Sequence, residues 1–421
     1  VIEPLPWPGA KSQNFDSLNR GKYRFIVTDK ASQKELYRQS YSSIYGEWET
    51  TGEAKKINRT FHESLRFPMP KNEVTVAIEK RDANHKFQHV WSIDISPEHY
   101  LNHRQSAAYK DQVIKIEYNG DPTEKVDLLI LGDGYTKAEL ADFENTAKRL
   151  TEAMFATSPF KEYRQHFNVW ALAPVTKESG VSRPSAGKYH DSPLAVTYDA
   201  FGSERYVLTT NNKAFRTIAA SAPYDVVEIL VNNETYGGGG IYGQFSTAAA
   251  NSDWAEYLFI HEFGHHFAGL ADEYYTSSVA YSAPENIIEP YEPNVTALLP
   301  GQPLKWQKDV TKGTPLPTPW AKAEYEQHSY EYQKVRAKLR NDSKPEIEMN
   351  KLFVDNQNIV EGMFSKDKYV DAIGAFEGAN YSAKGYYRSE LNCIMFTRTE
   401  EFCHVCKQGI IDIIKMYSAA K

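Results

Sequence analysis

The pattern of hydrophobic and polar positions changes near residue 102. Before that point, short runs of β-branched and aromatic residues at 23–27, 73–78 and 88–93 lie between turn-forming Pro, Asp and Asn residues. Alternate positions of a further run follow one face of a strand at period two, namely Arg59, Phe61, Glu63, Leu65 and Phe67. Several short strands at this spacing predict an all-β sandwich for residues 1–102.

From residue 103, compact apolar runs alternate with helical spacing. The run 126–131 ends at Gly132-Asp133-Gly134, which predicts a buried strand and then a tight turn. Thr136 is placed to cap a helix whose apolar side chains recur at helical spacing, at Phe143, Ala147, Leu150 and Met154. Runs at 167–172 and 226–231 predict further strands, and the stretch 275–320 has the Pro, Ser and Asn content of loops. The sequence therefore predicts an α+β fold, with a second domain at residues 103–421.

Charge and composition narrow the class of protein. The chain of 421 residues has 48 basic and 55 acidic side chains and a formal net charge of -7. Nucleic acid and anionic membranes require a basic surface, so neither is an expected partner. No apolar run approaches the ~20 residues that a membrane helix needs, and we expect no transmembrane segment and a monomer. The chain starts at Val1, which is consistent with a secretory protein after signal removal or with a chain shortened at its start.

The segment 260–273 contains a residue pattern that indicates a metal-binding site. His261 and His265 are four residues apart, so on a helix their imidazoles project from one face and can bind one metal ion. Glu262 stands beside that ion, where it can take a proton from water as a general base. Ser252 or Asp253 is the expected N-cap, and apolar anchorage for the helix comes from Trp254, Tyr257, Leu258 and Phe259.

A catalytic zinc ion needs a third protein ligand and one open position. Gly269 is where the helix would end, so the chain can turn back and deliver an acidic residue. Adjacent side chains point to opposite sides, so only one of Asp272 and Glu273 can reach the metal. We favour Asp272, with Glu273 as the alternative, and expect the other to support a ligand histidine or the turn. His266 neighbours His265 and is not an expected ligand.

The motif His261-Glu262-x-x-His265, followed by a glycine and an acid, resembles that of metzincin zinc peptidases. The glycine arrives one residue later than in the usual metzincin pattern, because Ala268 stands in its place. This shift, with Ala-Asp-Glu-Tyr at 271–274, resembles the IgA-peptidase family of secreted bacterial zinc metallopeptidases. The resemblance extends over essentially the whole chain. It implies an all-β N-terminal domain before a metzincin-like peptidase domain with a mixed sheet and an active-site helix.

The resemblance also assigns roles outside the motif. Segment 391–396 is similar to the methionine-turn of metzincins, which implies that Met395 forms an apolar floor below the ligands. Segments 377–381 and 385–388 are similar to the approach to that turn, and Tyr387, close to the turn, is a candidate to stabilise an oxyanion. The glycine run at 237–243 lies where metzincins have a substrate-pairing edge strand, here Gly239, Gly240 and Ile241; a flexible turn is an equally weighted alternative.

Two further features have competing interpretations. Asp133 is either a turn residue or a calcium ligand, and the turn is favoured. The three cysteines all lie near the end of the chain, at Cys393, Cys403 and Cys406. We expect a disulfide from Cys393 to either of the others in an oxidising compartment, and three thiols in a reducing one. A structural zinc site is disfavoured because no second cysteine pair is present.

These expectations combine into a secreted, periplasmic or cell-surface zinc endopeptidase that acts on proteins or peptides. Host or dietary glycoproteins such as immunoglobulin A are candidate substrates. Two alternatives stay open: a zinc exopeptidase, and a non-catalytic β-sandwich adhesin with a degenerate peptidase domain. An intact Glu262 speaks against degeneracy, because a binding protein has no need of a general base.

Overall fold

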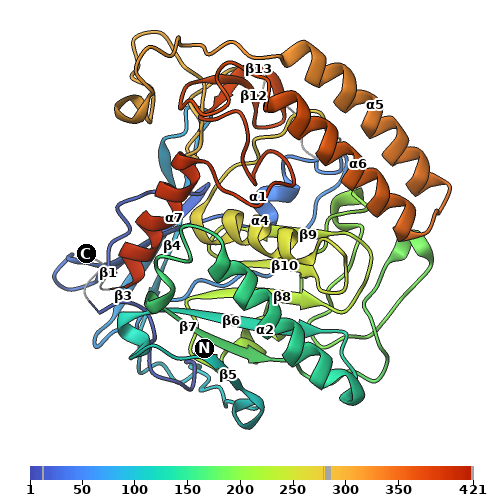
Figure 1. Ribbon diagram of the computed structural model, residues 1–421. Coiled ribbons are helices and arrows are strands. Elements are labelled where there is room, and N and C mark those ends of the chain that lie inside the picture. Colours follow the sequence, from blue (N-terminus) through green and yellow to red (C-terminus); the bar gives the residue numbers. More distant parts are fainter. Residues whose placement is uncertain (12–13, 278, 280–285, 419–421) are drawn as a thin grey trace.

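The computed structural model describes residues 1–11, 14–277, 279 and 286–418. A β-rich N-terminal region precedes a central mixed sheet with helices on both faces, and the C-terminal part adds a helix pair, a hairpin and a last helix (Figure 1). The α+β fold expected from the sequence is confirmed.

The N-terminal region contains one antiparallel sheet of four strands. β1 (Tyr23–Asp29) lies between β2 (Glu35–Tyr41) and β3 (Val74–Arg81), and β4 (Phe87–Ile95) pairs with β3 at the edge. All three expected strand runs fall in these elements. A short helix, α1 (Ile44–Trp48), starts after Ser43, whose hydroxyl accepts a hydrogen bond from the Gly46 N–H.

The expected strand from Arg59 to Phe67 is wrong, because this segment has no strand partner. Leu65 and Phe67 pack instead on the buried face of the four-stranded sheet, next to Phe25. The alternation of residue types indicates which side chains face the core. It does not by itself predict a strand, because a strand also needs a hydrogen-bonded neighbour. Among the described residues up to 102, this loop segment covers the face that a second sheet would cover in a sandwich.

The central sheet has six strands in the order β5-β7-β6-β8-β10-β9. The four inner strands run parallel, and both edge strands are antiparallel to their neighbours. Every residue of β6, β7, β8 and β10 is buried, which is why the sequence shows continuous apolar runs there. The strands are β5 (Ile114–Glu117), β6 (Val126–Asp133), β7 (Phe167–Leu172), β8 (Val226–Val231), β9 (Gly238–Ile241) and β10 (Phe245–Ala249).

Helices cover both faces of this sheet. Alternate residues of β6 separate the two cores: Leu128 and Ile130 pack with α2 (Leu140–Ala156) and α4 (Ala255–Ala268), whereas Leu129 and Leu131 face α3 (Asn212–Ala219). Thr136, the expected cap, forms a capping box with Glu139 in the 3₁₀ turn Lys137–Glu139 that leads into α2, whereas the N-cap of α2 itself is Glu139. The helix of the metal motif, α4, therefore lies on the sheet beside α2 (Figure 1).

The C-terminal part closes over α4. Helices α5 (Lys322–Asn341) and α6 (Glu346–Phe364) pack side by side, and α7 (His404–Tyr417) packs against α4. A small sheet joins β11 (Val295–Thr296) to the hairpin of β12 (Phe376–Ala379) and β13 (Ser382–Arg388). The stretch 275–320 has little regular structure, as expected, although its residues 278 and 280–285 lie outside the described ones. Single 3₁₀ turns lie at Lys110–Gln112, Pro122–Glu124, Lys137–Glu139, Arg164–His166, Pro184–Ala186, Ala200–Gly202 and Gln307–Asp309.

Arg20 joins the N-terminal region to the helix of the metal motif. Its guanidinium is buried and donates to the carbonyls of Ala268, at 2.8 Å, and Gly409, at 2.7 Å, and it pairs with Asp412 at 3.1 Å. Ala268 is the last residue of α4, whose terminal carbonyls lack partners within the helix. A cation at this end therefore both caps the helix and interacts favourably with its dipole.

The division of the chain into two domains at residue 102 stays a prediction.

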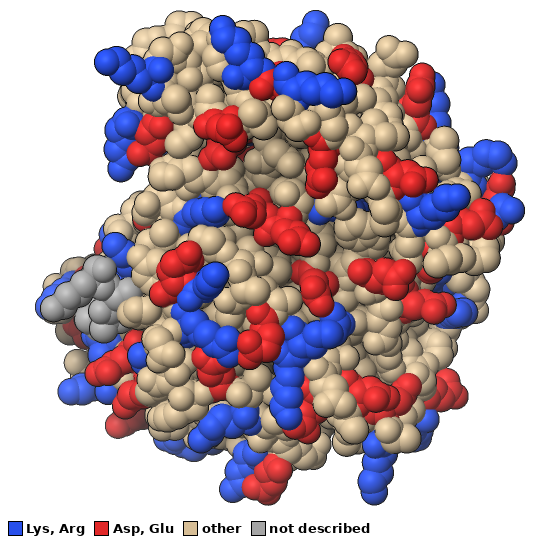
Figure 2. All heavy atoms as spheres, in the orientation of Figure 1, with Lys and Arg blue, Asp and Glu red and all other residues tan. Residues whose placement is uncertain are grey.

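In Figure 2, acidic and basic side chains are interspersed over the visible face. No helix among the described residues is long and apolar enough to cross a membrane.

We predict that Arg20→Ala lowers the free energy of unfolding by about 2 kcal/mol or more, because it leaves two buried carbonyls without their charged donor. Lys148→Ala, which breaks an exposed ion pair on α2, should change it by less than about 0.5 kcal/mol. Urea unfolding of both variants measures the difference. Equal effects would contradict the proposed capping role.

Candidate active site

Helix α4 brings the two histidines of the motif together. It starts at Ala255 with Trp254 as N-cap and no side-chain cap, so the expected caps Ser252 and Asp253 are wrong by one or two residues. The Ser252 hydroxyl instead accepts from the Trp254 N–H in the preceding turn, at 3.2 Å. Of the apolar residues expected to anchor the helix, Leu258 and Phe259 are buried in the core, and Trp254 and Tyr257 are partly buried and pack against it.

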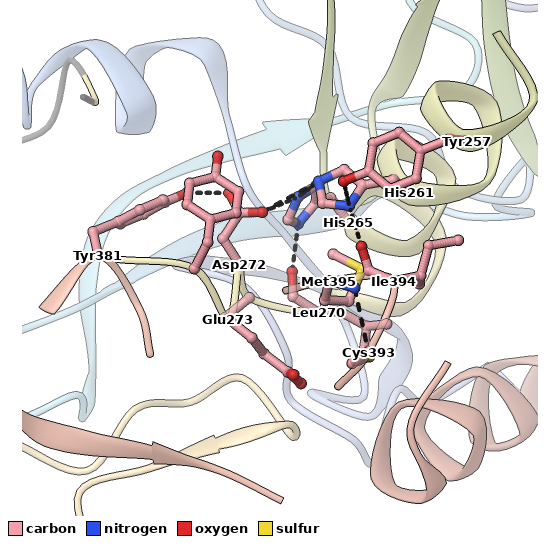
Figure 3. Close-up of polar contacts among 12 residues, drawn as sticks. Tyr257, His261, His265, Leu270, Asp272, Glu273, Tyr381, Cys393, Ile394 and Met395 are labelled. Carbon is pink, nitrogen blue, oxygen red and sulfur yellow. Dashed lines mark hydrogen bonds and ion pairs between the residues drawn. The ribbon is translucent and has the colours of Figure 1, made fainter. Parts of the chain in front are cut away.

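Each histidine is oriented by a backbone carbonyl. His261 Nδ1 lies 2.9 Å from the Ile394 oxygen, and His265 Nδ1 lies 2.6 Å from the Leu270 oxygen. A carbonyl can only accept, so both Nδ1 atoms carry a proton, and in its neutral form each imidazole keeps a lone pair on Nε2. The two Nε2 atoms are 3.2 Å apart (Figure 3). Tyr257 further supports His261, with its hydroxyl 3.1 Å from Nδ1.

Asp272 completes a triangle of acceptor atoms. Gly269 ends α4 with a φ of 60°, and the chain turns back so that Asp272 Oδ1 lies 3.2 Å from Nε2 of both His261 and His265. Figure 3 shows the Glu273 side chain pointing away from this triangle, on the side of Cys393. Of the two adjacent acids, the structure thus brings Asp272 to the histidines.

These three atoms suit a small cation. Two imidazole lone pairs and a carboxylate oxygen face one another, and Asp272 Oδ1 is buried without a hydrogen-bond partner. Tetrahedral zinc with bonds of about 2.0–2.1 Å would hold neighbouring ligand atoms about 3.3–3.4 Å apart, close to the separations here. The donor set and its spacing therefore fit a metal ion of the zinc type.

Glu262 lies beside the triangle and against β9. Burial raises the pKa of its carboxyl above the usual value, and the neighbouring His261 and His265 oppose part of this effect. Gly238 leaves the space that the side chain occupies, since a Cβ there would lie 2.9 Å from Glu262 Cγ and 3.1 Å from Oε1. A carboxylate with a raised pKa next to a metal site has the properties of a proton acceptor.

The glycine run forms the edge strand β9, not a flexible turn. Its glycines let α4 approach: a Cβ on Gly240 would collide with the Glu262 carbonyl oxygen and lie 2.8 Å from His265 Cβ. Gly238 exchanges backbone hydrogen bonds with Arg205 and Val207 on the outer side of the strand. Gly240 lies two residues further on. Its N–H and C=O point to the same outer side, because the backbone polar groups of every second residue in a strand point the same way.

The segment 391–396 forms a turn beneath α4, where the methionine-turn was expected. Met395 is fully buried, and a Cβ on Gly264 of α4 would lie 3.2 Å from its sulfur. The Met395 carbonyl accepts from the Glu273 N–H at 2.8 Å, and the Ile394 carbonyl holds His261. The turn therefore fixes both the helix and the segment that carries Asp272.

The structure also brings to the site the hydroxyl of Tyr381, which the sequence did not single out. It donates to Asp272 Oδ2 at 2.6 Å from the tight β12–β13 turn, where Asn380 and Tyr381 both have positive φ. Tyr387, the expected oxyanion stabiliser, does not line the cavity, because its neighbour Tyr386 on β13 faces it instead. No local signal distinguishes Tyr381, since its position depends on a hairpin that docks onto 272–274.

A cavity of about 420 Å³ opens over the site. Its walls include the triangle, Glu262 and β9 on one side and N-terminal residues such as Lys22, Glu47 and His85 on the other. The contribution of the N-terminal region to this cavity could not be seen in the sequence.

The remaining residues that the sequence analysis named, which are His266, Asp133 and the three cysteines, make structural contacts away from the triangle. His266 is buried between Ile241 O and the Val227 N–H, at 3.1 Å each, and burial lowers its pKa to about 3. Both carboxylate oxygens of Asp133 accept hydrogen bonds from the segment 192–196, which supports the turn interpretation over calcium. The cysteines are free thiols, and Cys393 and Cys406 have their sulfurs 3.7 Å apart, so the expected disulfide is not formed here.

The fold and this site together define a metallopeptidase. The family model described as IgA Peptidase M64 matches residues 114–414, and the model described as Peptidase M64 N-terminus matches residues 1–92. The chain therefore belongs to the IgA peptidase M64 family, as the resemblance implied. A search of curated proteins gave no match.

We predict that Gly240→Ala lowers the free energy of unfolding by about 1–3 kcal/mol, since the added methyl group must displace the α4 backbone at Glu262. Gly52→Ala is the matched control, because no atom lies within 4 Å of a Cβ at that position. Thermal and urea unfolding compare the two. An unchanged stability of Gly240→Ala would show that β9 and α4 are not in this close contact.

We also predict that Tyr381→Phe weakens metal binding by about 10–100-fold, because Asp272 loses the donor that fixes its carboxylate. Tyr387→Phe, on the same hairpin but outside the cavity, should leave metal affinity unchanged. Competition with a chromophoric chelator measures both affinities. A larger loss in Tyr387→Phe would reverse this assignment.

Proposed function

We propose that the protein is a zinc-dependent endopeptidase with Glu262 as general base. The observation that carries the proposal is the triangle of His261, His265 and Asp272, with three mutual separations of 3.2 Å beside Glu262. Membership of a metallopeptidase family supports it.

Zinc is the proposed metal because two imidazoles and one carboxylate are typical ligands of a catalytic zinc ion. Bound there, zinc would supply Lewis acidity to a substrate carbonyl and make water more acidic. His261, His265 and Asp272 would hold it. Ile394, Leu270 and Tyr381 would keep those ligands oriented through the hydrogen bonds described above.

Glu262 would move the protons. Its carboxylate would accept a proton from the attacking water and deliver it to the leaving nitrogen as the peptide bond breaks. Burial favours this role, because a raised pKa makes the carboxylate a better proton acceptor than an exposed glutamate.

An extended peptide is the proposed form of the substrate. The outward N–H and C=O of Gly240 can pair with a substrate strand added at the edge of the central sheet. Pairing through backbone groups does not require a chain terminus, which favours internal cleavage over exopeptidase action. The family's name makes immunoglobulin A one substrate to test, and we propose that the protein acts in the periplasm, at the cell surface or after secretion.

We predict that Glu262→Gln reduces peptide cleavage at least about 10²-fold while the zinc content stays that of the wild type, because glutamine keeps the shape but cannot accept the proton. Glu256→Gln, an exposed position on the same helix, is the matched control and should retain full activity. Cleavage of unfolded proteins and of immunoglobulin A is followed by mass spectrometry of new termini, with metal measured by elemental analysis.

Three outcomes would contradict the proposal. Full cleavage by Glu262→Gln would place the base elsewhere. A zinc content of His265→Ala equal to that of the wild type would show that no zinc is bound at the triangle. A wild-type protein that binds peptides with zinc present but cuts none would favour the adhesin.

A further inference from the structure

A second group of metal-ligating side chains lies on the far side of the segment that carries Asp272. We call it the cysteine cluster: Glu273, Cys393, Cys403 and Cys406. All four residues are buried, and one ligand atom from each lies within 4.8 Å of all the others. They come from three parts of the chain, since Glu273 follows Asp272, Cys393 begins the turn of Met395, and the other two lie at the start of α7.

The sulfurs of this cluster accept several hydrogen bonds. Cys393 Sγ accepts from the N–H groups of Cys403, at 3.2 Å, and Met395, at 3.5 Å. Cys403 Sγ accepts from the Cys406 N–H at 3.4 Å and from the Ser389 hydroxyl at 3.3 Å. A neutral thiol is only a weak acceptor, so two donors directed at each of these sulfurs suit a thiolate that is bound to a metal ion.

Glu273 adds an acid to these sulfurs. Its Oε1 accepts from Asn294 at 3.0 Å and lies 3.4 Å from Cys406 Sγ and 3.8 Å from Cys403 Sγ. Its Oε2 is buried with no partner among the described residues. The nearby guanidinium of Arg388 donates to the carbonyls of Gly378 and Leu391. A buried carboxylate among thiolates is unfavourable unless a cation compensates the charge.

We propose that the cysteine cluster binds a structural zinc ion, separate from the one proposed at the histidines. Tetrahedral zinc with bonds of about 2.3 Å to sulfur and about 2.0 Å to oxygen separates two sulfurs by about 3.8 Å and a sulfur from an oxygen by about 3.5 Å. The observed separations are 3.7 Å between Cys393 and Cys406 and 3.4 Å and 3.8 Å to the Glu273 oxygen. Soft thiolates select zinc over calcium or magnesium.

Zinc explains the cluster better than a disulfide does. A disulfide would use two of the three cysteines and leave the third, together with Glu273, buried without a role. Zinc binding uses all four groups: each thiol gives up its proton to solvent, four ligand bonds form, and nothing is oxidised.

The second ion would stabilise the floor of the first site. Glu273 is bonded in sequence to Asp272, and its N–H donates to the Met395 carbonyl. Cys393 lies one residue before Ile394, whose carbonyl orients His261. A metal held by Glu273 and Cys393 therefore ties the segment of the third ligand to the turn beneath the histidines.

The test counts metals in the full-length protein and identifies their ligands. The wild type should contain two zinc ions per chain, and His265→Ala should contain one. X-ray absorption at the zinc edge of His265→Ala should show three sulfur ligands at about 2.3 Å. Cys403→Ser should lose the sulfur-bound ion, whereas His404→Ala, an exposed neighbour between the two α7 cysteines, should keep both ions.

The outcomes separate this inference from the proposed function. One zinc in the wild type and none in His265→Ala would overturn the second site and leave the proposed function standing. One sulfur-bound zinc in both proteins would support the second site and remove the catalytic one. A single free thiol in the denatured, unreduced chain would show a disulfide and overturn the inference, and three would support it. Because Cys403→Ser can fail to fold, the absorption spectrum of His265→Ala decides.

Discussion

The left-handed residue at the end of α4 is the constraint on which the site depends. Gly269 has a φ of 60° and closes the helix with hydrogen bonds from its own N–H to His265 and from Leu270 to Gly264. This turn aims the Leu270 carbonyl at His265 and returns Asp272 to the histidines two residues later. Any residue with a Cβ would be strained in this conformation, and here it would also approach Tyr242 and Arg20.

The position of α4 is set from two sides by close contacts that only small residues allow. On the sheet side, Gly238 and Gly240 of β9 bring the strand against Glu262 and His265. On the opposite side, Gly264 lies against Met395. A helix held this tightly cannot move by the width of a methyl group unless its neighbours repack. Packing therefore fixes the positions of the ligands together with the hydrogen bonds.

The two adjacent acids, Asp272 and Glu273, contact two different groups of side chains behind α4. Asp272 points to the histidines, where Tyr381 holds its second oxygen, and Glu273 points to the cysteines, where Asn294 holds it. Adjacent side chains in extended chain face opposite ways, so one short segment serves both groups. The turn of Ile394 and Met395 bonds to both the helix and this segment, and the two groups are therefore mechanically connected.

The sequence by itself determined the features that local pattern controls. The runs at 126–131, 167–172 and 226–231 became buried strands because their apolar composition needs cover on both faces. Thr136 and Gly269 marked helix ends, and the spacing of His261 and His265 put both on one face of a helix. Tertiary structure decided the rest. Residues 59–67 alternate like a strand but have no strand partner, the hydroxyl that contacts Asp272 is that of Tyr381 and not of Tyr387, and the cysteines lie beside Glu273. Each of these depends on which distant segment lies alongside, and a pattern within one segment carries no information about that contact.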